Sequence, residues 1–228
     1  MTKPKHIAVI MDGNGRWATA QHKKRIEGHR QGTETVDRLL DALLIQKISV
    51  VSLYAFSTEN WRRPKTEVFA LFKLLDEFIS SRLEKLIAKG VRIIVSGNYS
   101  RLPRNSRVLI EEAILKTKKN KKLIANFCLN YGARDEIHRA AWLYAKTGVK
   151  TKVPSEKEFK KYLYTANLPD VDLVVRTAGE YRLSNFLLYQ SAYAELVFLD
   201  KCWPDFNEND LRQTIQEFSK RKRNFGAI

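Results

Sequence analysis

The chain has 228 residues, 44% of them hydrophobic, and its lysines and arginines outnumber aspartates and glutamates by 41 to 25. The net charge of +16 favours anionic partners such as phosphorylated metabolites, nucleic acid or a lipid surface, without choosing among them. The only two cysteines, Cys128 and Cys202, exclude a disulfide framework and lack the spacing of a zinc site. We expect one domain, 1–228, in a reducing cytoplasm, without a linker, a signal peptide or a membrane span.

Apolar runs and helical patterns alternate along the chain. A strand is predicted at His6–Met11, then a helix carrying Val36, Leu39, Leu40, Leu43 and Leu44, then a strand at Ile48–Phe56. A long helix over 67–88 ends at Gly90, before a strand at Val91–Val95. The later elements are a helix near 104–118, a strand near 122–129, helices near 134–146 and 155–165, strands at 171–176 and 196–199, and a helix from about 207 to 222. This order predicts an α/β fold with a largely parallel central sheet flanked by helices.

The first predicted strand runs directly into Asp12, Gly13, Asn14, Gly15 and Arg16. Such an apolar run is typical of a strand buried on both faces, and open α/β sheets bind ligands beyond the carboxyl ends of their strands. These residues supply the components of a diphosphate site. They are a carboxylate, glycine backbone that a ligand can approach closely, and a guanidinium that can contact two phosphate oxygens. Taken alone, the pattern fits a tight turn better, and it matches neither the Walker A nor the GxGxxG pattern.

Two further predicted strands are followed by similar groups, in 57–64 (STENWRRP) and 176–184 (RTAGEYRLS). Because the carboxyl ends of parallel strands meet at one edge of a sheet, these loops are expected to converge with the first. Each arginine is by itself an ordinary surface charge. Together they predict a pocket that holds more than one phosphate group, and the arginines concerned are Arg16, Arg63, Arg176 and Arg182.

A leaving diphosphate is commonly neutralised by Mg²⁺ held by one or two carboxylates. Asp12 is the first candidate ligand because it directly follows the buried strand. Glu195 stands between apolar residues just before a predicted strand, where a second ligand and an edge-facing charge are about equally good explanations.

Several blocks of the sequence resemble the cis-prenyltransferase family, and in particular the bacterial undecaprenyl diphosphate synthases (isoprenyl transferases). The blocks run in the expected order from residue 6 to about 206: HIAVIMDGNGRWA, RIEGHRQG, SLYAFSTENWRRP, NYGARDEI, and DLVVRTAGEYRLSNFLLYQSAYAELVF followed by WPDF. The resemblance implies a Mg²⁺-dependent enzyme that joins isopentenyl diphosphate to an allylic diphosphate such as farnesyl diphosphate. Each cycle would create a Z double bond and release diphosphate.

By position, the resemblance implies that Asp12 binds Mg²⁺ and promotes loss of the allylic diphosphate, with Glu195 as the second metal ligand. The allylic diphosphate and its pocket are matched by Gly13, Asn14, Gly15, Arg16, Trp17, Arg25 and His29. The loop beside the reacting carbons is matched by Ser57, Thr58, Glu59 and Asn60, and further substrate contacts by Trp61 and Arg63. Asn60 takes the role of proton acceptor, although an amide is a poor base. The isopentenyl diphosphate site is matched by Arg176, Arg182, Leu183 and Ser184.

The helix over 67–88 carries a wide apolar stripe, which fits either plain core packing or the wall of the product tunnel that the resemblance implies. Three positions depart from the family pattern, namely Ala133, Ala178 and Tyr181, and they bear on substrate preference more than on activity. The basic segment 220–226 resembles a tail that reaches the neighbouring subunit of a dimer, and fits a solvated helix end comparably well.

The leading hypothesis is a homodimeric, chain-elongating cis-prenyltransferase that supplies the lipid carrier for cell-wall glycans. It would lie in the cytoplasm with peripheral contact at the inner face of the membrane. The alternatives are a synthase of shorter cis-prenyl diphosphates and a non-catalytic partner subunit of the same fold. A nucleic-acid-binding protein is suggested only by the basic charge, and we expect no nucleic acid partner.

Overall fold

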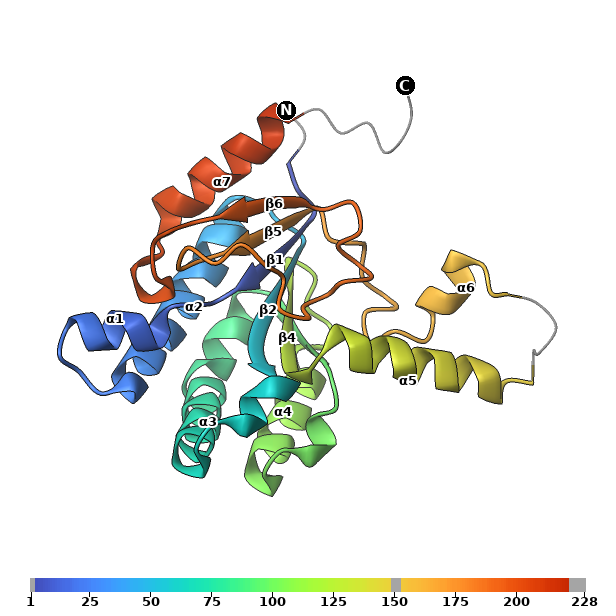
Figure 1. Cartoon of the computed structure of the whole chain (residues 1–228), viewed down its shortest axis with the longest axis horizontal. Coiled ribbons are helices and arrows are strands. Elements are labelled where there is room, and N and C mark those ends of the chain that lie inside the picture. Colours follow the sequence, from blue (N-terminus) through green and yellow to red (C-terminus); the bar gives the residue numbers. More distant parts are fainter. Residues whose placement is uncertain (1–2, 149–152, 222–228) are drawn as a thin grey trace.

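The computed structural model describes residues 3–148 and 153–221, and its centre is one six-stranded sheet (Figure 1). The strands are β1 (His6–Ile10), β2 (Val50–Ser57), β3 (Val91–Ser96), β4 (Leu123–Tyr131), β5 (Leu173–Arg176) and β6 (Glu195–Phe198). They pair in the order β3-β4-β2-β1-β5-β6, and every pair of neighbours is parallel. The parallel sheet predicted from the alternating pattern is therefore confirmed.

Seven α-helices connect or follow the strands in the described part of the chain. They are α1 (Asn14–Ala20), α2 (Arg25–Ile45), α3 (Lys65–Ala88), α4 (Arg104–Thr117), α5 (Ala133–Lys146), α6 (Glu156–Lys160) and α7 (Glu208–Lys220). Three short 3₁₀ helices are η1 (Thr58–Arg62), η2 (Tyr99–Arg101) and η3 (Trp203–Asp205). The pattern predicted α2 to α7, although α6 ends earlier than expected. It missed α1, which is short and shows no apolar repeat.

The sheet is covered on both faces, as the uninterrupted apolar strands require. Helices α2, α3, α4 and α7 pack together on one face, whereas α5 and α6 project from the other side of the sheet (Figure 1). Alternate residues of β1 consequently enter different cores: Ile7 and Val9 pack in the larger cluster, and Ala8 and Ile10 in the smaller one. All five residues of β1 are buried, so this strand is a rigid support for whatever follows it.

Within residues 3–148 and 153–221, none of the helices combines the length and the apolar character needed to cross a membrane. The longest of them, α3, carries charged residues beside its apolar stripe. It ends at Ala88, two residues before Gly90, which has a φ of 77°. The segment 222–226, which includes most of the basic tail, lies outside the described residues.

Candidate active site

The loops that follow β1, β2 and β5 meet at one edge of the sheet because β1 lies between the other two strands. Asp12 Oδ2 accepts a hydrogen bond of 2.8 Å from Arg176 Nη2, across 164 positions of sequence. Arg176 is only 3% exposed, and its other terminal nitrogen donates to Ser184 Oγ at 2.8 Å and to the Arg182 carbonyl at 2.5 Å. The predicted convergence of these residues is therefore what the structure shows.

The turn after β1 has a tightly constrained backbone. Gly13 has a φ of 97°, and a Cβ at this position would lie 2.8 Å from Ala178 Cβ and 2.9 Å from Cys202 Sγ. Only glycine fits there, because it lacks the Cβ and tolerates this φ. The Gly13 amide donates to Asp12 Oδ1 at 2.7 Å, so the carboxylate is fixed by its own turn as well as by the arginine.

Arg16 lies across the opening of this turn. Its Nη1 donates to the Ala178 carbonyl at 2.8 Å, and its Nη2 lies 3.2 Å from Glu180 Oε1 and 3.8 Å from Asp12 Oδ1. Half of the Arg16 side chain remains exposed, so these surface pairs are weak and an incoming phosphate can replace them.

A second charged group joins α2 to the start of α3. Glu67 Oε1 lies 3.3 Å from Arg63, 3.7 Å from Arg25 and 3.8 Å from His29. The pKa of His29 is lowered to about 4, mainly by burial and also by Arg63 and Arg25, while Glu67 opposes them. His29 is therefore neutral near pH 7, so its imidazole offers a hydrogen-bonding group rather than a charge. Its Nε2 is buried without a hydrogen-bond partner among the described residues.

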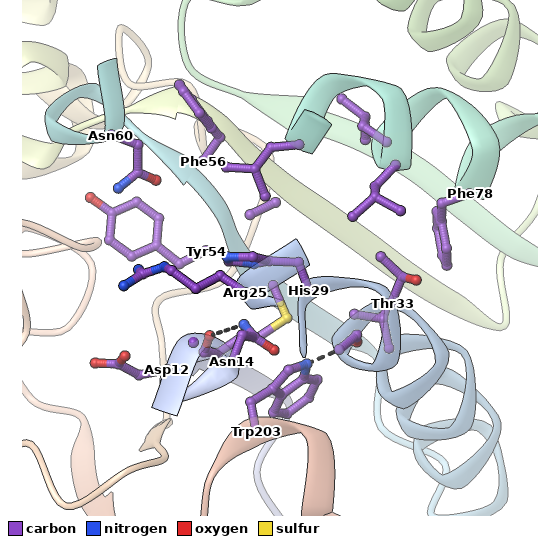
Figure 2. A pocket seen from close by; sticks show the side chains of 18 of the residues that line it. Asp12, Asn14, Arg25, His29, Thr33, Tyr54, Phe56, Asn60, Phe78 and Trp203 are labelled. Carbon is purple, nitrogen blue, oxygen red and sulfur yellow. Dashed lines mark hydrogen bonds between the residues drawn. The ribbon is translucent and has the colours of Figure 1, made fainter. Parts of the chain in front are cut away.

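One cavity of about 300 Å³ connects these charged groups to an apolar interior. Figure 2 shows Asp12, Arg25 and Asn60 toward one end of it and Phe78 toward the other. The predicted site residues that line it are Asp12, Gly13, Asn14, Gly15, Arg16, Arg25, His29, Asn60 and Arg63. Its apolar wall comes from α2, α3 and the sheet, and includes Val36, Phe56, Leu71, Leu74, Leu75, Phe78, Phe127 and Leu129.

A second cavity of about 20 Å³ lies beyond the floor of the first and is lined entirely by apolar residues. The two cavities share four lining residues, Leu75, Phe78, Phe127 and Leu129. The rings of Phe78 and Phe127 lie 6.0 Å apart between their centroids, and both belong to the wall that the two cavities share.

The loop after β2 is held by its own hydrogen bonds. Asn60 Oδ1 accepts from the Ser57 amide at 3.0 Å, so the Asn60 amide nitrogen is the group left to face the cavity. Trp61 does not line the cavity: its Nε1 donates to Asn130 Oδ1 at 2.7 Å, and its ring packs against Phe56 and Phe72. Of the predicted residues in this loop, Asn60 and Arg63 line the cavity.

Trp17 and Glu195 also lie away from the cavity. The Trp17 indole points to η3, where its Nε1 donates to Asp205 Oδ1 at 2.7 Å, so its contact with a substrate stays a prediction. Glu195 begins β6, level with Ile7 of β1, and its Oε2 accepts from Arg221 at 2.8 Å. It is therefore about 10 Å behind the carboxyl end of the sheet and two strands from Asp12. Within one chain these two acids do not lie side by side, and the ion that they would share stays a prediction.

The residues that sequence reasoning missed are mostly those that hold the site together. Glu67 follows Arg63 by four positions at the start of a predicted helix, a spacing that signals a pair. Thr177 accepts from the Asp12 amide at 3.0 Å, and Tyr54 donates to the carbonyls of Tyr131 and Ser184, both at 3.3 Å. Neither Thr177 nor Tyr54 carries a sequence signal, because their roles depend on the order of the strands.

The donor set at the sheet edge fits a magnesium ion only when the ligand supplies further oxygens. Among residues 3–148 and 153–221, no group of three or more His, Cys, Asp or Glu side chains could hold a metal. Asp12 is one partly exposed carboxylate that lines the cavity. One or two carboxylates together with substrate phosphates are a usual coordination for Mg²⁺.

Comparisons with known proteins agree with this geometry. Residues 10–226 match the family model described as "Putative undecaprenyl diphosphate synthase". An isoprenyl transferase of Leptospira interrogans is 54% identical over 99% of this chain and 95% of that protein. The structure is similar to lavandulyl diphosphate synthase from Lavandula x intermedia in complex with dimethylallyl diphosphate, with a TM-score of 0.95, 31% identity and 98% of each chain covered. A probable undecaprenyl diphosphate synthase from Campylobacter jejuni aligns with a TM-score of 0.84 and 38% identity, covering 99% of this chain and 100% of that one.

Proposed function

The chain belongs to the undecaprenyl diphosphate synthase family of prenyltransferases, and on this basis we propose that it condenses isopentenyl diphosphate repeatedly onto an allylic diphosphate, with farnesyl diphosphate as the starter. The product would be a long-chain Z-polyprenyl diphosphate, used as the precursor of a glycan lipid carrier. The reaction class follows from the family, whereas the substrates and the product are our proposal.

The cavity is the observation that supports the proposal best. Its opening is lined by Asp12, Arg16 and Arg63, and its interior by the apolar side chains of α3. An allylic diphosphate has the same division, with a charged head and an apolar tail. A pocket that only packs the core would not carry these charged groups at one end.

The chain's own residues can hold the head group of the allylic substrate. Bare backbone at Gly13 and Gly15 allows close approach, and Arg16 and Arg63 supply guanidiniums for the phosphate oxygens. As the carbon–oxygen bond of the allylic diphosphate breaks, negative charge grows on the leaving group. Fixed donors aimed at that charge lower the barrier because they need no rearrangement during the reaction.

We propose Asp12 as the protein ligand of a magnesium ion that binds with the diphosphate. The ion would supply charge neutralisation to the leaving group. Glu195 reaches such an ion only from a second copy of the chain, given its place behind the sheet edge. A homodimer is proposed for that reason, and the exposed Tyr193 and Leu196 beside β6 are apolar surface that a second copy could cover.

Isopentenyl diphosphate is assigned to the loop after β5. Arg182 is well exposed and pairs with Glu180, and Ser184 Oγ lies beside the buried Arg176. Asn60 takes part as a hydrogen-bond donor rather than as the base, because its side-chain oxygen already accepts from Ser57. We place the enzyme in the cytoplasm, with its basic surface against the anionic inner face of the membrane.

The test is incubation of the purified chain with farnesyl diphosphate, isopentenyl diphosphate and Mg²⁺. Diphosphate release measures turnover, and mass spectrometry of the extracted lipid measures the number of added units. Release of diphosphate that requires both substrates supports the proposal. Absence of any isopentenyl transfer would refute it, and would favour a non-catalytic subunit.

A shorter product is the second candidate, and the closed floor of the cavity favours it. Phe78 and Phe127 belong to the apolar wall shared with the second cavity, so a growing chain that reaches this wall needs it to move. The same mass analysis separates the two candidates. A product with one or two added units would identify a short-chain synthase.

A further inference from the structure

Asn185 joins three loops of the site through hydrogen bonds to different parts of the chain. Its Nδ2 donates to Glu59 Oε1 at 3.0 Å, in the loop after β2. Its Oδ1 accepts from the Arg134 amide at 2.9 Å, and its carbonyl oxygen accepts from the Ala133 amide at 2.8 Å, both after β4. The residue itself lies in the loop after β5.

Asn185 also occupies a backbone conformation that most residues avoid, with a φ of 64°. Asparagine tolerates this region better than other residues with a side chain, which explains how a side chain with two useful groups can stand here. The preceding residue, Ser184, has a φ of 48° and bonds Arg176. A strained segment of this kind persists only where its surroundings hold it.

The packing around Asn185 is tight. A Cβ on Gly132 would lie 2.7 Å from Asn185 Nδ2 and 2.7 Å from Thr58 Oγ1. Gly132 has a φ of −152°, which any residue can adopt, so only this contact opposes a side chain there. The three loops thus meet at one point, with no space for an added methyl group unless Asn185 or Thr58 moves.

Through these bonds, two acids of the site are connected. Glu59 contacts Asn185, whose neighbour Ser184 contacts Arg176, which in turn contacts Asp12. Partial burial raises the pKa of the Glu59 carboxyl, but hydrogen bonds from Asn185 and from its own loop outweigh burial and leave the pKa below its ordinary value. Glu59 is therefore a charged acceptor for Asn185 near neutral pH.

We propose that Asn185 is a positioning residue that sets the distance between the two substrates. It holds the loop of Arg182 and Ser184, assigned to isopentenyl diphosphate, against the loop of Glu59 and Asn60, assigned to the reacting carbons. This inference rests on the proposed function. A misplacement of about 1 Å between reacting groups can cost about 100-fold in rate, even when each substrate still binds.

The first test compares Asn185→Gly with the wild-type enzyme. Glycine keeps the left-handed backbone and removes only the side chain, so the fold and the Ala133 bond are retained. We expect kcat to fall about 10- to 100-fold, with the dissociation constant of farnesyl diphosphate and the thermal midpoint little changed. Lys47→Gly is the matched control, since Lys47 is an exposed residue with a φ of 58° far from the site.

The second test is a double-mutant cycle with Glu59→Ala. If Asn185 acts through Glu59, the double variant should be no more than about 2-fold slower than Asn185→Gly alone. Gly132→Ala, which pushes on the same contact, should give the same loss of kcat. A wild-type kcat in Asn185→Gly would overturn the proposal. So would a double variant whose loss of kcat equals the product of the losses in Asn185→Gly and Glu59→Ala.

A readout that needs no turnover separates this inference from the proposed function. The Arg134 amide donates to the Asn185 side chain and the Ala133 amide to its backbone, so Asn185→Gly should speed hydrogen exchange at Arg134 but not at Ala133. If wild type lacks isopentenyl transfer, the proposed function fails, and unchanged exchange at Arg134 would then overturn the positioning role too. Should the glycine variant not fold, Asn185→Asp keeps the Oδ1 acceptor and replaces only the donor to Glu59, and the same kcat loss is expected.

Discussion

Asp12 and Arg176 form a direct ion pair with 2.8 Å between Oδ2 and Nη2, at the carboxyl ends of two neighbouring strands. The arginine side chain is almost fully buried, whereas a third of the aspartate side chain is exposed toward the cavity. The buried partner fixes the carboxylate, and the exposed part of the carboxylate remains free to meet a ligand. Asp12 consequently has two roles, one in stability and one in the proposed reaction.

Asp12→Ala is expected to reduce diphosphate release by about 100-fold or more, because it removes the one acid that lines the cavity among the described residues. The free energy of unfolding should also fall, by about 1–3 kcal/mol, since Arg176 keeps only its bonds to Ser184 and Arg182. Turnover and urea denaturation measure the two effects. Asp12→Asn is the control: it keeps an acceptor for Arg176, so it should recover stability without activity. Equal activity in Asp12→Ala and wild type would contradict the role of this acid.

Removal of divalent ions with EDTA is expected to abolish isopentenyl transfer, and added Mg²⁺ should restore it. Because Asp12 is the cavity-lining carboxylate that we place on the ion, a metal titration of Asp12→Asn should show a weaker half-saturation than wild type. Transfer that is insensitive to EDTA would rule out a metal role. Calorimetry of Mg²⁺ with and without farnesyl diphosphate tests whether the ion needs the substrate to bind.

His29 predicts a pH dependence of stability. Its pKa is about 4 in the folded chain and 6.5 as the ordinary value, so between these values the unfolded state binds more protons. Stability contributed by neutral His29 is therefore complete above about pH 6.5 and is lost as the pH falls toward 4, by about 3 kcal/mol. We expect the free energy of unfolding of wild type, compared with His29→Gln, to decrease by this amount over that range. His6 is buried in both proteins, so its effect cancels in the comparison.

Phe78→Ala should lengthen the lipid product by opening the floor between the two cavities. The free energy of unfolding should fall by about 1–3 kcal/mol, less than for a fully buried phenylalanine, because one side of Phe78 already faces empty space. Mass spectrometry of the product measures the first effect and thermal denaturation the second. Phe69→Ala on the same helix is the matched control, since that ring is 70% exposed and should affect neither. An unchanged product distribution in Phe78→Ala would exclude this floor.

Ala178→Gly is expected to stabilise the protein by about 0.5–1 kcal/mol. Ala178 has a φ of 75°, a conformation that costs alanine more free energy than glycine. Glycine also gives the unfolded chain more conformational freedom, which opposes folding, but we expect the relief of backbone strain to be larger. Ala133→Gly is the opposite control, because Ala133 begins α5 with ordinary helical geometry and should lose stability. Chemical denaturation of both variants gives the sign. Destabilisation by Ala178→Gly would show that the strain at this turn is absent.

Most of the fold could be predicted from local patterns. Continuous apolar patterns in the sequence predicted the strand at residues 6–10 and the long helix α3. The alternation of strands and helices along the chain indicated the parallel sheet. The short helix α1 could not be recognised, because seven residues following a left-handed glycine carry no repeat. The convergence of Asp12 with Arg176 was predictable only because parallel strands share an edge.

Where the site differs from expectation, the cause is the three-dimensional placement of a side chain, which the order of residues along the chain does not give. Glu195 begins its strand, whereas Asp12 follows one. Because ligands bind beyond the carboxyl ends of strands, the rule that favours Asp12 as a site residue does not apply to Glu195 within the same chain. Trp17 is close to the motif in sequence, but one turn of helix directs its indole to Asp205. Asn185 went unrecognised because its three partners come together only in the finished sheet.

The position of β1 has a consequence for synthesis on the ribosome. This strand is made first, pairs with β2 early, and keeps its other side unpaired until β5 has been translated. Until then the nascent chain exposes a strand edge that could pair with another molecule, and Asp12 lacks its buried partner Arg176. The site proposed here is therefore assembled only after β5 has been translated, because the Asp12–Arg176 pair joins the first strand to the fifth.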